Sequence, residues 1–94
     1  MDILSKLCAW YKQQYVPETH EDVGIEIGTL DNPGWSLKVD LEETELKDRV
    51  FNDVKIDRTD DDWLVARRNG IKFEAFGGVN NLAEMIEVFL DWAD

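Results

Sequence analysis

The first part of the chain has apolar residues at helical spacing. Asp2 stands where an N-cap is expected, because its side chain can accept a backbone N–H of the first turn. Val16-Pro17 should end the helix, since a residue before proline is disfavoured in the α region. The pattern predicts an amphipathic helix over about residues 3–15, followed by a polar connection over residues 17–22. The apolar positions are Ile3, Leu4, Leu7, Cys8 and Tyr11.

The period then changes from 3.6 to 2. Alternation of Val23, Ile25 and Ile27 with polar residues and glycines predicts a half-buried strand that ends near Leu30. A second, longer alternation predicts another strand; its apolar positions are Trp35, Leu37, Val39 and Leu41. Between the two, Asp31-Asn32-Pro33-Gly34 fits a type II turn with Pro33 and Gly34 at its centre. The two strands should therefore form an antiparallel hairpin.

A third strand is predicted around Val54 and Ile56, after a charged segment, residues 42–50, that fits a loop or one helical turn. Asn69-Gly70 then fits a type I′ turn, because both residue types tolerate positive φ. That turn would join strands near residues 62–68 and 71–76.

The turn also predicts a register for these strands. Ala66 would oppose Phe73 on the core face, whereas Trp63 would oppose Phe76 on the outer face. An exposed aromatic pair of that kind is a candidate contact surface.

A second helix is predicted at the end of the chain. Gly77-Gly78 ends the last strand, and Asn81 with Glu84 has the spacing of a capping box. The helix has an apolar face and an acidic ridge, which consists of Glu84, Glu87, Asp91 and Asp94. The order of elements predicts one α+β domain over residues 1–94, an antiparallel meander sheet of about five strands with an N-terminal and a C-terminal helix packed on one face.

Composition limits the partners that the chain can bind. The 94 residues are 44% hydrophobic, which excludes a disordered acidic tail. A net charge of −11 repels phosphate backbones and anionic lipids, so we expect no direct binding to nucleic acid or membrane. Cys8 is the only cysteine, which excludes an internal disulfide, and its place on the apolar side of the first helix predicts a buried thiol. With neither a secretion signal nor a membrane span in the pattern, we expect a cytoplasmic protein.

No residue set has the spacing of a catalytic or metal site. The only histidine, His20, stands among acids in a predicted loop, and no serine or cysteine is near it in sequence. The run Asp60-Asp61-Asp62 is followed by Trp63 and lacks the pattern of a calcium loop. We therefore predict no catalytic residues, no metal and no cofactor, although paired carboxylates remain possible among twenty-one acids.

The acids instead predict a partner-binding surface. Asp91 and Asp94 stand at the end of the last helix, where the macrodipole disfavours negative charge. Because this placement is unfavourable for the helix, we expect these charges to serve in binding a partner. Such a surface would fit the basic cleft of a protein that processes nucleic acid. Self-association through exposed aromatics is the alternative, and a small hydrolase is a weaker one. The predicted binding residues are Asp60, Asp61, Asp62, Trp63, Phe76, Glu84, Glu87 and Asp91.

Several segments, in the same order along nearly the whole chain, carry a resemblance to a known family. They are Leu4-Ser5-Lys6-Leu7-Cys8-Ala9-Trp10-Tyr11, Thr29-Leu30-Asp31-Asn32-Pro33-Gly34-Trp35, Val39-Asp40-Leu41, Asp61-Asp62-Trp63, Phe73 with Gly77-Gly78, and Asn81-Leu82 with Phe89-Leu90-Asp91-Trp92-Ala93. The sequence resembles the immunity protein 53 family of bacterial polymorphic-toxin loci. That resemblance implies a small cytoplasmic protein that binds and neutralises a toxin encoded beside it. It assigns no functional residues and leaves the oligomeric state open.

Overall fold

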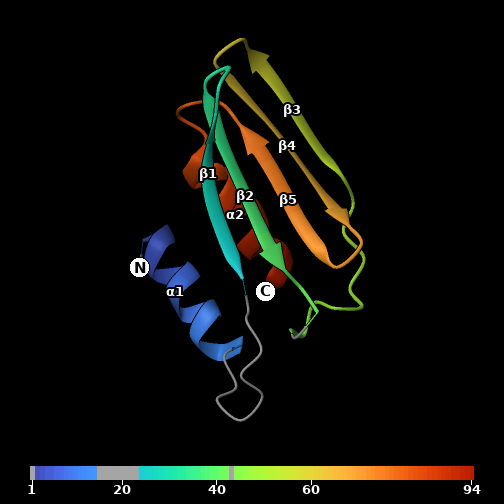
Figure 1. Cartoon of the computed structure of the whole chain (residues 1–94). Coiled ribbons are helices and arrows are strands. Elements are labelled where there is room, and N and C mark those ends of the chain that lie inside the picture. Colours follow the sequence, from blue (N-terminus) through green and yellow to red (C-terminus); the bar gives the residue numbers. More distant parts are fainter. Residues whose placement is uncertain (1, 15–23, 43) are drawn as a thin grey trace.

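The sheet and its helices form two layers. The computed structural model describes residues 2–14, 24–42 and 44–94. In the described chain both helices lie on the same side of an antiparallel sheet whose other face is open (Figure 1). This arrangement confirms the predicted α+β fold class. The elements are α1 (Ile3–Gln14), β1 (Ile25–Leu30), β2 (Gly34–Asp40), β3 (Val54–Thr59), β4 (Asp62–Asn69), β5 (Lys72–Gly77) and α2 (Leu82–Ala93).

The strand order is β1-β2-β5-β4-β3, which is not the order of a meander, because β5 rather than β3 lies beside β2. Burial explains this difference. Phe73, Glu74 and Ala75 of β5 are all buried, as suits a central strand, whereas β3 has only Val54 and Ile56 half-buried and its remaining residues exposed. The segment between β2 and β3, which was predicted as a loop or one helical turn, consists of turns where it is described.

The core lies between the helices and one face of the sheet. Phe89 of α2 is fully buried and meets Trp10 of α1 edge to face, with ring centroids 4.9 Å apart, and Phe73 of β5 at 5.0 Å. These rings connect both helices to the central strand. The other buried apolar residues are Leu7, Leu37, Val39, Leu41, Leu46, Leu64, Ala66, Ala75, Met85, Ile86 and Ala93.

Helix α1 buries a narrower stripe than its sequence predicts. Leu7, Trp10 and Gln14 face the protein, while Leu4 and Tyr11 are 58% and 43% exposed. The prediction of a buried Cys8 is wrong, because this thiol is exposed. The reason is angular: consecutive helical residues are about 100° apart, so with Leu7 in the interface its neighbour turns toward solvent. The predicted helix stop at Val16-Pro17 lies outside the described residues.

The hairpin of β4 and β5 confirms the predicted faces and corrects the register. Its two turn residues are Gly70, with φ of 60°, and Ile71, instead of Asn69 and Gly70. Ala66 therefore pairs with Ala75, and Phe76 pairs with Val65 rather than with Trp63. A shift by two residues preserves the alternation, so Trp63 and Phe76 are still on the outer face. They are not directly opposite each other, because Trp63 lies two residues before Val65, the partner of Phe76.

The hairpin of β1 and β2 is also confirmed, but its predicted type II turn is wrong. Leu30 pairs with Gly34, so the loop between them has three residues, and the Asn32–Pro33 peptide bond is cis. Gly34 has no positive φ and belongs to β2. A side chain at this position would overlap the carbonyl oxygen of Gly77 on the neighbouring strand β5. Glycine is thus needed here for close backbone approach rather than for turn conformation.

Candidate functional site

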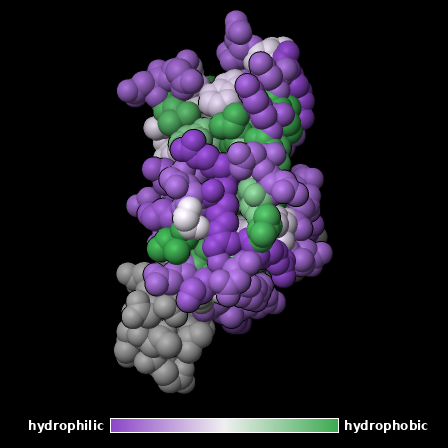
Figure 2. All heavy atoms as spheres, turned by 90° about the vertical axis from the view of Figure 1, so that its right-hand side faces the viewer, coloured by the Kyte–Doolittle hydropathy of each residue, from purple (hydrophilic) through white to green (hydrophobic). Residues whose placement is uncertain are grey.

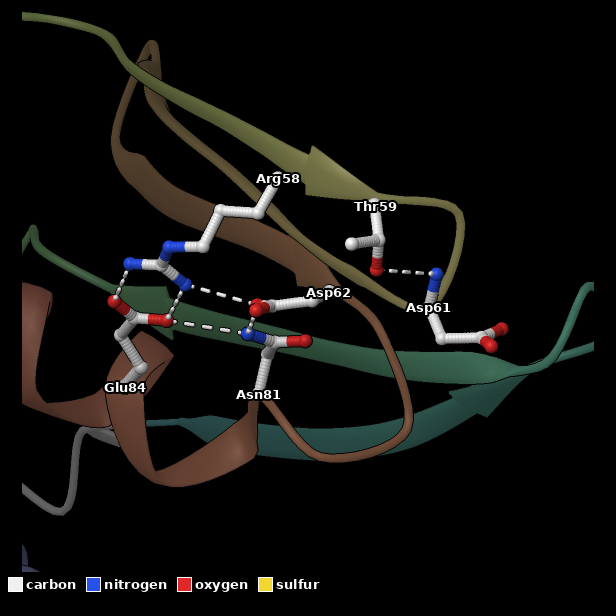
Figure 3. Close-up of polar contacts among 6 residues, drawn as sticks. All are labelled: Arg58, Thr59, Asp61, Asp62, Asn81 and Glu84. Atoms are coloured by element: carbon white, nitrogen blue, oxygen red, sulfur yellow. Dashed lines mark hydrogen bonds and ion pairs between the residues drawn. The ribbon is translucent and has the colours of Figure 1, made fainter.

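Two of the predicted binding residues meet in a charged cluster at the start of α2 (Figure 3). Arg58, near the end of β3, donates from Nη1 to Asp62 Oδ1 at 2.9 Å. The same guanidinium spans the carboxylate of Glu84, with Nη1 to Oε1 at 3.0 Å and Nη2 to Oε2 at 2.7 Å. Asn81 completes the cluster, because its Nδ2 donates to Asp62 Oδ1 at 2.9 Å and to Glu84 Oε1 at 3.1 Å. We call these four residues the Arg58 cluster.

The Arg58 cluster replaces the predicted capping box. Asn81 is the N-cap residue of α2, as predicted, but its side chain makes no capping hydrogen bond. Its Nδ2 donates to the two carboxylates, while its buried Oδ1, the atom that would accept a backbone N–H in a cap, has no hydrogen-bond partner among the described residues. The acidic ridge is therefore not free of basic partners: Glu84 has one from β3, outside its own helix.

Charge pairing shifts the titration of the cluster. Hydrogen bonds from Asn81 and then Arg58 lower the pKa of Asp62 below its ordinary value. Hydrogen bonds from Arg58 and then Asn81 lower the pKa of Glu84. The same contacts, from Glu84 first and Asp62 second, raise the pKa of Arg58. All three groups are therefore charged at neutral pH.

The other two acids of the triple-aspartate run face solvent. Asp60 and Asp61 form the turn between β3 and β4, and both are exposed. The backbone N–H of Asp61 donates to Thr59 Oγ1 at 3.2 Å, which helps to hold the turn. Within the described ranges, no lysine or arginine lies at ion-pair distance from either carboxylate. These two negative charges therefore remain available to a partner.

Two further acids of the ridge are also unpaired in the described part of the chain. Glu87 and Asp91 are exposed along α2, with no basic partner at ion-pair distance in the part of the chain that the structure describes. Asp91 and Asp94 border a groove of about 540 Å³ between α1 and α2. Its wall includes Trp10, whose buried indole N–H has no acceptor among the described residues. We call Asp60, Asp61, Glu87 and Asp91 the acidic surface.

The two predicted aromatic anchors lie elsewhere. Trp63 and Phe76 are half-buried on the open face of the sheet, because their neighbours Leu64 and Ala75 point toward the helices. Beside Phe76, the guanidinium of Arg67 lies 5.8 Å from the ring centroid and pairs with the buried Glu74 at 3.0 Å. Of the predicted binding residues, the structure thus brings together Asp62 and Glu84 through Arg58, and it leaves Trp63 and Phe76 on the face of the sheet opposite the helices.

Only part of the Arg58 cluster could be predicted from the sequence. Arg58 stands four residues before Asp62, a spacing that suits a local ion pair, but its stronger contact is with Glu84, twenty-six residues away. The sequence predicted Asn81 only as the N-cap of the last helix and not as a partner of Asp62 and Glu84. Among the residues that the structure describes, no group of three or more histidine, cysteine or acidic side chains is arranged to hold a metal ion. His20 lies outside the described residues.

Comparison with known families decides the assignment. The family model described as Immunity protein 53 matches residues 4–94, nearly the whole chain. The chain belongs to the immunity protein 53 family. Membership in the immunity protein 53 family implies a protein that acts against a toxin, and it indicates a binding protein rather than an enzyme. Comparisons with curated proteins and with solved structures gave no significant match. Neither described helix has the length and apolarity needed to cross a membrane.

Proposed function

We propose that this immunity protein binds a toxin encoded by a neighbouring gene and covers its functional site with the acidic surface. The observation that supports the proposal is the exposure of four acids that pair with no described basic residue. Holding like charges together without counterions is unfavourable in the free protein, and a basic partner relieves that repulsion. The same field accelerates association, because it steers a positively charged partner toward this side.

The charge also narrows the class of toxin. An enzyme that cuts nucleic acid presents a basic cleft to the phosphate backbone. A chain with a net charge of −11 complements such a cleft, so we propose a nuclease-type toxin. Nucleic acid is the substrate of such a toxin inside the cell, and a chain with a single, exposed cysteine suits a reducing compartment. We therefore place the action of this protein in the cytoplasm.

The Arg58 cluster has a supporting role in this proposal. Asp62 and Glu84 are tied to Arg58, so they contribute less net charge than the acids around them. Their contribution is to fix the β3–β4 turn against the start of α2, which holds Asp60 and Asp61 in place before the partner arrives. Preorganised charge binds better than flexible charge because less conformational entropy is lost.

Trp63 and Phe76 are proposed as apolar anchors at the border of this surface. Trp63 directly follows Asp62, so a partner that extends around the β3–β4 turn reaches the open face of the sheet. Aromatic residues contribute strongly to binding when a partner buries them.

Co-expression with the product of the adjacent open reading frame tests the proposal. We expect a stable complex in a pull-down and restored growth when the neighbour is induced. A double variant, Asp60→Asn with Asp61→Asn, should weaken both the complex and the rescue of growth. The same change at Asp48 and Asp53, at the other end of the sheet, should weaken neither. A toxic neighbour that neither binds nor is neutralised would overturn the immunity role for this locus. Sedimentation across a concentration range would then test self-association.

A further inference from the structure

The two edges of the sheet differ in how they are protected from pairing with another strand. The β3 edge carries Lys55, Asp57 and Arg58, and its register with β4 shifts between Asp57 and Thr59. Charged side chains and bulges of this kind hinder the addition of a further strand. Figure 2 faces this edge and shows hydrophilic residues over most of it, with hydrophobic residues gathered in smaller spots.

The β1 edge has almost none of this protection. Glu26 is its only charged residue, and the side chain of Ile27 is 43% exposed. Helix α2 lies against β2, β5 and β4 but not against β1. In the described part of the chain β1 pairs only with β2, so half of its backbone N–H and C=O groups point outward with no strand to receive them.

A hollow beside this edge offers a place for a side chain. Gly28 of β1 pairs with Ser36 of β2, and a small residue at both positions leaves a shallow hollow on the open face. Glu26 and Lys38 flank it with opposite charges. A Cβ added at Gly28 would lie 3.2 Å from Ser36 Oγ, so even a small side chain there would begin to fill the space. A glycine inside a strand often marks a place where another chain approaches closely.

We propose that an extended segment of the toxin adds to β1 as a further strand. Its backbone would pair with the outward groups of β1, and one of its side chains would enter the hollow over Gly28 and Ser36. The inference rests on the proposed function, because it names the form in which the partner binds. A second copy of this chain is the less favoured occupant, since two chains with net charges of −11 repel each other.

Two variants of β1 and one matched control test this inference against the purified toxin. Ile27→Lys places a charge on the edge, and because Ile27 is already half-exposed its replacement can reach solvent without unfolding the sheet. Gly28→Val fills the hollow. The control, Val50→Lys, makes the same change of charge at a position that is 79% exposed and away from β1. We expect each β1 variant to weaken binding about ten-fold, equivalent to about 1.4 kcal/mol, and the control to bind like the wild type.

Hydrogen exchange provides a second measurement that does not depend on the variants. The backbone amides of residues 25–30 should exchange more slowly in the complex, and those of residues 47–53, which lie away from both β1 and the β3–β4 turn, should not change. Equal binding by all three variants with no added protection of β1 overturns the inference, while wild-type binding and rescue leave the proposed function intact. Absence of wild-type binding and rescue overturns both. Protection of β1 that rises with concentration in the free protein would assign the edge to a second copy and also overturn the inference.

Discussion

Arg58 of β3 and Glu84 of α2 face each other as two parallel forks, with nitrogen–oxygen distances of 3.0 and 2.7 Å. This contact joins an edge strand to the first turn of a helix twenty-six residues later. The position of Glu84 is favourable in itself, because negative charge in the first turn complements the helix dipole. Both side chains are partly exposed, at 46% and 33%, so solvent screens the attraction. The paired geometry therefore contributes more to the orientation of β3 relative to α2 than to the free energy of unfolding.

We predict that the Arg58 cluster makes folding stability depend on pH in the acid range. The folded-state pKa values of Asp62 and Glu84 are lowered, so their stabilising effect is complete above the ordinary values near 4 and is lost as pH falls through the lowered values. Arg58→Gln should thus lower the urea midpoint at about pH 7, and the difference from wild type should shrink by about pH 3. Urea unfolding at both pH values measures this.

Lys55→Gln provides the matched control for that series. Lys55 is exposed on the same strand, and no described acid pairs with it, so its loss should change the midpoint little at either pH. A constant difference between Arg58→Gln and wild type from neutral to acid pH would show that the effect does not come from the two carboxylates.

A second prediction concerns the aromatic core. Phe89 is fully buried and contacts rings from α1 and β5, so Phe89→Ala leaves a cavity where both helices meet the sheet. Truncation of a buried phenylalanine costs about 3–5 kcal/mol. Thermal and chemical unfolding should show a loss of this size, compared with a change of about 0.5 kcal/mol or less for Val50→Ala at an exposed position. Similar losses for the two variants would contradict the central place of Phe89.

The sequence predicted the elements well because each has a clear period or turn signal. The alternation from Trp35 to Leu41 and the helical stripe of α2 depend only on neighbouring residues, and both were confirmed. The strand order was not predictable in this way. It follows from the relative burial of β5 and β3, which concerns the whole sheet. The predicted register of the β4–β5 hairpin was wrong for a local reason. Two adjacent residues, Asn69 and Gly70, both suited the turn, and the structure places Gly70 and Ile71 in it.

The candidate site was predictable only in part for the same physical reason. Exposed acids are visible in a sequence, and Asp60, Asp61, Glu87 and Asp91 are indeed exposed. Pairing over long distances in the chain is not visible. Arg58 was therefore not predicted as the partner of Glu84. The turn signal at Asn69 and Gly70 likewise could not show which face of the sheet the helices leave open.

The close approach of β2 and β5 leads to a third prediction. Gly34→Ala introduces a methyl group that overlaps the backbone carbonyl of Gly77, and a backbone atom cannot move aside as a side chain can. Such overpacking costs about 1–3 kcal/mol. Gly28→Ala in the same hairpin is the control, because its methyl group meets the rotatable hydroxyl of Ser36 at 3.2 Å. Chemical unfolding should rank Gly34→Ala as clearly less stable; the reverse order would refute a backbone clash at Gly34.

The last prediction separates long-range steering from simple contact. Asp60→Lys with Asp61→Lys reverses charge on the acidic surface and leaves Asp62, which holds Arg58, untouched. We expect the association rate with the toxin to fall about ten-fold at low salt and its dependence on ionic strength to become shallower. The dissociation rate should change less, because exposed charges at a rim act mainly on the encounter.

Asp48→Lys with Asp53→Lys supplies the matched control for this rate measurement. Both positions are exposed, and Asp53 precedes β3, so it lies a strand length of about 20 Å from the turn that holds Asp60. The change in net charge is the same in the two double variants. Stopped-flow association across an ionic-strength series should therefore show a larger effect at the turn. Equal slowing in both would mean that net charge alone attracts the partner, and no slowing in either would remove electrostatic steering from the mechanism.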